Sequence, residues 1–242
     1  SAMLAVHDMA DDVITARQKS GASAPPDLLD LLLDGEDPET KRSMNKVELR
    51  DNLLAFITAG HETTALALSW ALYLLAFDPK VQAKVQAEVR AVIGTGPATR
   101  DHIDELVYTR QVIDETLRLY PPAPIVSRTA QQDDEICGRK IKKGQTVVIP
   151  IYCLHRHKLL WDNPDAFDPD RFNGKTKIDR FSYIPFIDGP RICIGASFAL
   201  HEAVIILATL ANNFTFHAIE GKVPRPEMVL TMRPAGGVWL KA

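Results

Sequence analysis

Residues 186–195 read FIDGPRICIG and place one cysteine, Cys193, among turn-forming residues directly before a long apolar segment. The apolar segment predicts a helix over residues 195–212. Helix N-termini carry partial positive charge and Arg191 adds a nearby cation, so this position favours a thiolate over a thiol. The residues alone leave two interpretations open, a buried inert cysteine and a thiolate that binds a metal.

The other residues of the stretch fit the second interpretation. Gly189 and Gly195 are expected to adopt backbone conformations closed to other residues, and to let backbone N–H groups approach the sulfur. Phe186 is placed to cover the sulfur and keep water away from it. We therefore predict a structured loop around the thiol.

The composition of the 242-residue chain is that of a soluble globular protein, with 46% hydrophobic and 24% charged residues. A net charge of −3, without a long basic run, argues against nucleic-acid binding. The odd number of cysteines, without C-x-x-C spacing, argues against a disulfide framework or a structural zinc site. A reducing compartment is the default expectation.

The first half of the chain has helical periodicity. Asn45 and Glu48 form a capping-box pattern that starts a helix running to about Phe77. The sequence GHETT interrupts the apolar region 53–77, so we predict a buried helix and not a membrane span. Further helices are expected at residues 8–18, 26–33, 79–93 and 106–119.

The second half changes character before the last helix. Short apolar runs separated by turns predict strands and hairpins between residues 124 and 151. Residues 152–192 are expected to be mostly irregular, and such a long ordered loop is uncommon unless it is functional. Terminal strands are expected at 214–218 and 237–241. The predicted fold class is mainly α with a small β portion.

The pattern F-x-x-G-x-R-x-C-x-G in residues 186–195 matches every fixed position of the haem-binding signature of the cytochrome P-450 family. The chain thus resembles a haem-thiolate protein, and its motif order looks closest to bacterial fatty-acid-hydroxylase-like members. The resemblance implies haem b (iron protoporphyrin IX) as cofactor, with Cys193 as proximal iron ligand. It also implies that Arg191 pairs with a haem propionate and that Phe186 packs beside the sulfur.

The segment AGHETT, residues 59–64, lies within the long predicted helix. Taken alone, the segment also fits an ordinary helix in which the threonines bond back to the backbone and the glycine marks close packing. The segment resembles the oxygen-activating part of the same family. The resemblance implies that Ala59 and Gly60 leave room for O2, that Thr63 hydrogen-bonds the bound oxygen and that Glu62 helps to relay protons.

The sequence ETLRLYPP places Glu115 and Arg118 on one helix face, a spacing that by itself predicts a surface salt bridge. It also matches the E-x-x-R motif of the family, and FDPDRF matches a later element that supplies Arg171. The resemblance implies a buried structural triad of these three residues. The triad would brace the irregular segment 152–192, which leads to the cysteine loop.

Other positions carry weaker signals. Arg128 stands where the family often has a second propionate-binding arginine; the alternative is an exposed strand arginine. Residues 121–126 and 229–234 resemble substrate-lining segments, and their apolar character favours an apolar substrate. The other two cysteines match no ligand position. Residues expected to have core or surface roles instead of catalytic ones are His155, His157 and Trp161.

The resemblance implies a monooxygenase that activates O2 and inserts one oxygen atom into a C–H bond. Two alternatives stay open: a peroxygenase driven by H2O2, and a folding or partner-binding module without stable haem. The expected partners are an electron donor, either a ferredoxin or a flavoprotein reductase, and an apolar small molecule, with no nucleic acid. Basic residues form either a docking face for an acidic donor or an ordinary solvated loop. These residues are Lys175, Lys177, Arg180 and Arg191.

The resemblance runs from about residue 8 to the end but covers only the C-terminal half of the family fold. We therefore expect residues 1–242 to be the C-terminal portion of a single haem-binding domain whose N-terminal portion is absent. Such a half is expected to expose apolar surface and to self-associate through it. The expected location is the cytoplasm, with any membrane anchor in the absent portion.

Overall fold

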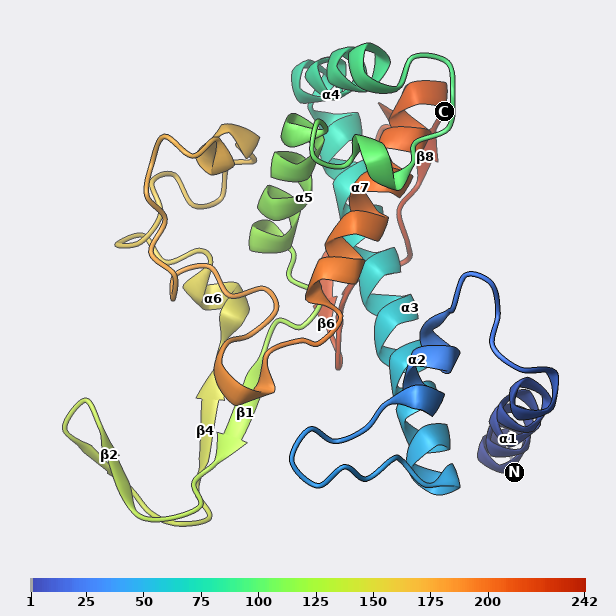
Figure 1. The fold of residues 1–242 in the computed structure, drawn as a ribbon. Helices are drawn as coiled ribbons and strands as arrows, with labels where there is room; N and C mark the ends of the chain where they lie inside the picture. Colours follow the sequence, from blue (N-terminus) through green and yellow to red (C-terminus); the bar gives the residue numbers. More distant parts are fainter. Residues whose placement is uncertain (1) are drawn as a thin grey trace. The chain divides into compact units, whose positions relative to one another are not determined.

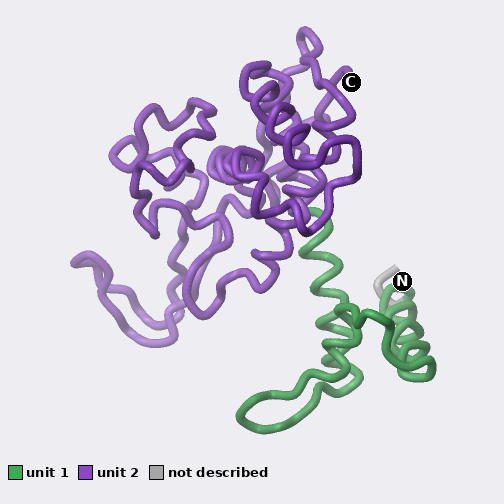
Figure 2. Tube along the Cα trace, turned by 45° about the horizontal axis from the view of Figure 1, so that its top comes forward, with its two compact units in different colours: residues 1–62 green, residues 63–242 purple. Residues whose placement is uncertain are grey.

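The computed structural model describes residues 2–242, with side chains from residue 5 onward. The chain forms two compact units, of which the first ends at Glu62 and the second comprises Thr63–Ala242. Figure 2 draws the two units in different colours. The boundary falls inside the long helix α3 (Lys46–Phe77), which contributes its first half to one unit and its second half to the other.

The first unit contains α1 (Ala2–Ser20), α2 (Leu28–Asp34) and the start of α3 (Figure 1). Its small core consists of Ile14, Leu29 and Leu49, one from each helix. Asn45 begins α3 as predicted: its side chain accepts the N–H of Glu48, whose carboxylate accepts the N–H of Asn45. This reciprocal capping box explains why α3 starts where it does.

The second unit is built around four helices that share one core. These are the second half of α3, α4 (Pro79–Ile93), α5 (Val107–Leu119) and α7 (Ala196–Asn213) (Figure 1). All four contribute buried apolar side chains to one cluster. Representative members, one from each helix, are Leu75, Val85, Val112 and Leu207. The apolar character of residues 65–77 therefore reflects central burial, as predicted.

Local signals set the ends of these helices. The Asp78 carboxylate accepts the N–H groups of Lys80 and Val81 at the start of α4, and Gly94 ends that helix with φ +67°. The short 3-10 helix η1 (Arg100–His102) leads to α5. The N-terminus of α5 is held by Glu88, whose carboxylate accepts the N–H groups of Tyr108 and Thr109.

Within residues 2–242, the named strands form four separate two-stranded antiparallel ladders. The expected hairpin region and terminal strands are confirmed, and one further hairpin near the C-terminus, β6–β7, was not predicted. The pairs are β1 (Val126–Thr129) with β4 (Thr146–Ile149), β2 (Asp134–Ile136) with β3 (Arg139–Ile141), β5 (His217–Ala218) with β8 (Leu240–Lys241), and β6 (Pro226–Met228) with β7 (Met232–Pro234).

Residues 152–192 are largely irregular, as predicted. The regular pieces near or within them are α6 (Ile151–Leu154), η2 (Pro169–Phe172) and η3 (Gly189–Arg191). The predicted fold class, mainly α with a small β portion, is confirmed. Among the residues that the structure describes, no helix has both the length and the apolar character needed to cross a membrane.

Candidate functional site

A short hydrogen-bonded loop carries Cys193. Its backbone N–H donates to the carbonyl of Phe186 at 2.9 Å, which closes the loop, and its carbonyl accepts the N–H of Ala196 at the start of α7. The turn η3 lies inside the loop. The cysteine is exposed, so its thiol faces solvent beside a helix N-terminus.

The two glycines of the loop differ from the prediction and from each other. Gly189 has φ +79°, the left-handed conformation expected of it. Gly195 has φ −87° and ψ 8°, so the prediction of an unusual backbone conformation at this position is wrong. Gly195 caps α7 with an ordinary turn geometry that any residue can adopt. A Cβ added there would lie 4.0 Å from the Cys193 sulfur, an ordinary contact distance.

The residue that unexpectedly adopts the left-handed conformation is Ile187, with φ +66°. This is a genuine outlier for a β-branched side chain. The next residue, Asp188, accepts the N–H of Gly189 and is paired with Arg180 at 2.7 Å. The hydrogen bonds from Arg180 hold the pKa of Asp188 below its usual value. The loop is therefore fixed by backbone and ionic contacts around a strained residue.

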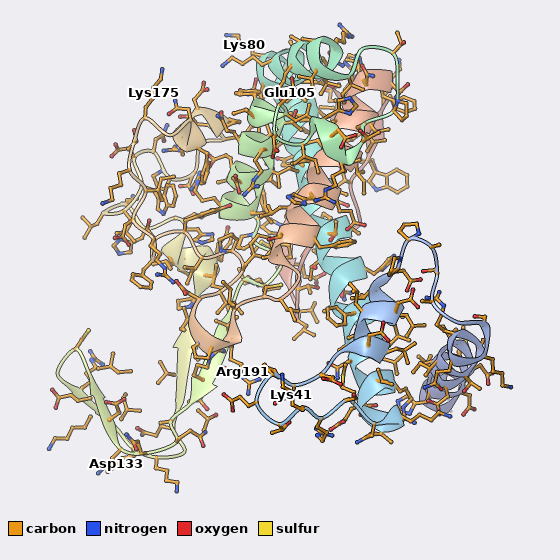
Figure 3. All side chains as sticks on the ribbon, viewed as in Figure 1. Lys41, Lys80, Glu105, Asp133, Lys175 and Arg191 are labelled. Atoms are coloured by element: carbon orange, nitrogen blue, oxygen red, sulfur yellow. The ribbon has the colours of Figure 1, made fainter. Side chains whose placement is uncertain are left out.

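The neighbours of Cys193 are exposed and mostly apolar. Ile192 is 57% exposed, Ile194 85% and Phe198 71%. Arg191, labelled in Figure 3, is an exposed cation on η3. The ring of Phe186 is half-buried and packs on the core, while its carbonyl accepts the N–H of Cys193. Cys193 stays exposed, so the prediction that this ring keeps water from the sulfur is wrong.

This surface fits a haem. A flat apolar ring with two carboxylates would cover the exposed apolar side chains, Arg191 would pair with a carboxylate, and Cys193 would supply a thiolate ligand for the iron. Within residues 2–242, no three His, Cys, Asp or Glu residues are grouped closely enough to hold a metal among themselves. The donor set around Cys193 is thus one thiol in an apolar surround.

A buried ion pair lies deeper in the same unit, on α5. Arg118 donates to both carboxylate oxygens of Glu115, at 2.6 and 2.8 Å, and both side chains are 0% exposed. The pair is therefore buried, as the resemblance implies and contrary to what spacing alone indicates. Burial raises the pKa of Glu115, and the hydrogen bonds from Arg118 oppose that rise.

The remaining hydrogen bonds of this pair go to the irregular segment. The Arg118 guanidinium donates to the backbone carbonyls of His155, Pro164 and Ala166. Glu115 accepts the N–H of Asp168 at 2.9 Å. Arg171 lies on η2 with its Nε 3.4 Å from a Glu115 oxygen, so the structure brings the three triad residues together. The chain between α6 and η2 is thereby anchored to α5.

Comparison with known proteins identifies the family of this chain. A family model described as cytochrome P450 matches residues 1–240. The chain belongs to the cytochrome P450 family. Among similar curated proteins is the putative cytochrome P450 132 of Mycobacterium tuberculosis, 38% identical over 232 residues, which cover 96% of this chain and 50% of the relative.

Two further relatives come from other organisms. Cytochrome P450 4V2 of Homo sapiens is 39% identical over 221 residues, covering 88% of this chain and 41% of the relative. Cyclooctatin synthase of Streptomyces melanosporofaciens is 37% identical over 237 residues, covering 96% of this chain and 52% of the relative. The P450 chain spans about half the length of the curated relatives it matches.

The AGHETT residues all lie within α3 of the P450 chain, on both sides of the boundary between the units. Ala59 and Gly60 are exposed, and a Cβ added at Gly60 would meet no atom within 4 Å. Glu62 and Thr63 are half-buried and each has an interaction partner. The space beside Gly60 is therefore open within the first unit.

The remaining predicted residues lie on the surface of the second unit. Arg128 is exposed on β1, and its guanidinium donates to the carbonyl of Ser127. Lys175, labelled in Figure 3, and Lys177 are exposed on the irregular segment. Arg180 is paired with Asp188, so part of the expected cationic face is neutralised.

The structure separates the three residues expected to have core or surface roles. His155 and Trp161 are buried at 0% and 5% exposure, and His157 is exposed. Tyr183, which the sequence did not single out, donates its hydroxyl to Asp114 on α5. No local pattern around Tyr183 predicted this role, because its hydrogen bond to Asp114 joins segments far apart along the chain.

Proposed function

We propose that this P450 chain forms the haem-bearing part of a haem-thiolate monooxygenase, with Cys193 as the iron ligand. The observation that carries the proposal is the exposed thiol in a hydrogen-bonded loop, surrounded by exposed apolar side chains and one arginine. When bound, haem b would supply the activation of O2 that allows one oxygen atom to enter a C–H bond of an apolar substrate.

The cysteine loop would hold the cofactor through several contacts. Arg191 would pair with one haem propionate, and Arg128 on β1 is the candidate for the second. Gly189 and Gly195 would leave the sulfur accessible, and Phe186 would fix the loop against the core. The exposed side chains around Cys193 would be covered by the ring.

Residues of α3 would handle the oxygen and its protons. Ala59 has a small side chain and Gly60 has none, so these residues would leave room for O2 beside the helix. Thr63 would hydrogen-bond the oxygen, and Glu62 would pass protons toward it through water. Residues 121–126 and 229–234, both rich in apolar side chains, would contact an apolar substrate.

The triad of Glu115, Arg118 and Arg171 would have a structural role, because it holds the backbone that leads to the cysteine loop. We also propose that both units belong to one haem-binding domain, since a single family model matches residues 1–240. The electron donor would be a ferredoxin or a flavoprotein reductase. A cytoplasmic location and self-association through exposed apolar surface remain part of this proposal.

The carbon-monoxide difference spectrum of the reduced, haem-supplemented protein tests the proposal. We expect the Soret shift of a thiolate-ligated haem, and we expect Cys193→Ala to abolish it. Cys153→Ala is the matched control, because Cys153 is also exposed but lies outside the loop. A signal that survives in Cys193→Ala would remove this residue from the ligand position.

The same preparation separates the remaining alternatives. An iron analysis that finds no retained haem would favour a partner-binding module for the chain. Turnover with H2O2 alone, and none with an electron donor, would favour a peroxygenase. Under the proposed function, Thr63→Ala should consume oxygen without matching product formation, and unchanged coupling would contradict its role.

A further inference from the structure

His155 lies between the buried helix α5 and the cysteine loop. Its side chain is 0% exposed, and its Nε2 accepts the backbone N–H of Ile184 at 3.0 Å. Its own carbonyl accepts Nη1–H of Arg118 at 2.8 Å. One residue thus contacts α5 through its backbone and the segment before Cys193 through its ring.

Hydrogen bonds continue from Ile184 to the cysteine. The carbonyl of Ile184 accepts the N–H of Ile187 at 3.0 Å, which closes a turn. The carbonyl of Phe186, inside that turn, accepts the N–H of Cys193 at 2.9 Å. Ile184 therefore attaches this turn to His155 by a backbone hydrogen bond, in addition to the packing of the Phe186 ring on the core.

No neighbouring backbone N–H before Phe186 could replace this hydrogen bond. Tyr183 is held by its hydroxyl, which donates to Asp114, and its ring centroid lies 5.4 Å from that of His155. The following residue, Pro185, has no N–H to donate. The amide of Ile184 is thus the last backbone donor before Phe186, and the imidazole is its acceptor.

The contact requires a neutral imidazole. Because Nε2 accepts a hydrogen bond, the proton of the neutral ring belongs on Nδ1. Protonation of Nε2 would place its new N–H opposite the Ile184 N–H, and neither group could accept a hydrogen bond from the other. The charged and titratable groups facing the ring are Arg118 from α5, the adjacent Arg156, and Tyr183. Burial lowers the pKa of His155 to about 4, and the positive charges of the two arginines add to that effect.

We propose that His155 is a positioning residue that connects the buried Glu115–Arg118 pair to the backbone carrying Cys193. The inference rests on the proposed function, because it takes Cys193 as the iron ligand. Loss or protonation of the imidazole releases the Ile184 amide. The turn around Phe186, and with it the hydrogen bond that closes the cysteine loop, then opens while α5 stays folded.

Hydrogen exchange of single amides in the haem-free protein tests this proposal, so its outcome does not depend on haem uptake or activity. In His155→Leu we expect the Ile184 amide to exchange at least about fivefold faster, and the Cys193 amide to follow. In His155→Gln we expect rates near wild type, because the amide oxygen of glutamine can accept the same N–H. The Val112 amide in α5 serves as the internal reference.

The matched control is His157→Leu. His157 is an exposed histidine two residues along the chain, and its Nδ1 also accepts a backbone N–H, that of Leu159. This variant should leave Ile184 exchange unchanged. Faster exchange at Ile184 in this variant would attribute the effect to the segment in general and would overturn the proposal.

The pH dependence gives an independent readout. The folded pKa of about 4 lies below the ordinary value of 6.5, so the unfolded or opened loop binds a proton that the closed loop does not. Protection of Ile184 relative to Val112 should therefore fall as the pH falls from about 6.5 toward 4. It should stay constant in His155→Gln, which has no titrating ring.

Two further results would overturn the proposal: unchanged Ile184 exchange in a folded His155→Leu, or the wild-type pH dependence persisting in His155→Gln. If His155→Leu unfolds as a whole, the pH dependence of Ile184 protection in His155→Gln still tests the proposal. Wild-type protection without the acid-dependent loss supports the proposal, and wild-type acid dependence contradicts it.

Discussion

The anchor on α5 and the cysteine loop lie in the same unit but are stabilised in opposite ways. The anchor buries a charge pair completely and satisfies it with bidentate hydrogen bonds and four backbone groups. The loop exposes its thiol and apolar neighbours, and contains a strained residue at Ile187. Because α5 and its ion pair provide the buried attachment, the loop can leave its thiol and apolar side chains exposed.

Breaking the anchor should have the largest effect. Arg118→Ala leaves the Glu115 carboxylate buried without its cation, and we expect a loss of about 3–5 kcal/mol in the free energy of unfolding. Urea denaturation measures it. The control is Lys142→Ala, which removes an exposed pair with Asp133 and should cost at most about 1 kcal/mol. Similar losses in both variants would show that the α5 pair is not a special anchor.

The two glycines of the loop provide a sharper test within it. Gly189→Ala forces a Cβ into a left-handed conformation and should cost about 1–2 kcal/mol. Gly195→Ala has an ordinary backbone conformation and room for the methyl group, so its effect on stability should stay within about 0.5 kcal/mol. Equal effects in urea denaturation would contradict the conformations described for the loop.

Ile187 allows the strain itself to be measured. Both Ile187→Ala and Ile187→Gly remove the same branched side chain, so their difference isolates the backbone conformation. At φ +66° we expect the glycine variant to be more stable than the alanine variant by about 1 kcal/mol. The opposite order, which is usual at ordinary φ values, would argue against strain at this position.

The smallest expected effect concerns Asp188 at the start of η3. Its folded pKa is lowered by the hydrogen bonds from Arg180, so its contribution to stability is present above the unfolded pKa and is lost as the pH falls through the folded pKa. The melting temperature of Asp188→Asn should therefore approach that of wild type below pH 4 and fall slightly short of it at pH 7. A constant difference across this range would show that the carboxylate charge contributes nothing.

The sequence predicts the elements with strong local signals and misses those without such signals. Asn45 and Glu48 specify the start of α3 because the capping box needs only four neighbouring residues. The β6–β7 hairpin was missed because Val229, Leu230 and Thr231 connect its strands without a typical turn residue.

The candidate site shows the same division. The signature around Cys193 is readable from spacing, but which residue adopts the left-handed conformation is not, and Ile187 does so where Gly195 was expected to. Burial of Glu115 and Arg118 followed from resemblance and not from periodicity, which indicates a surface pair. The role of His155 depends on a contact with Ile184, 29 residues away along the chain, which no local pattern reveals.

The choice of acceptors for Arg118 has an evolutionary consequence. Its partners outside α5 are the backbone carbonyls of His155, Pro164 and Ala166. Every amino acid carries such a carbonyl, so the contact survives most substitutions at Pro164 and Ala166 provided that the backbone path is kept. The segment can therefore accumulate sequence changes and diverge in surface chemistry between relatives without losing its attachment to the core.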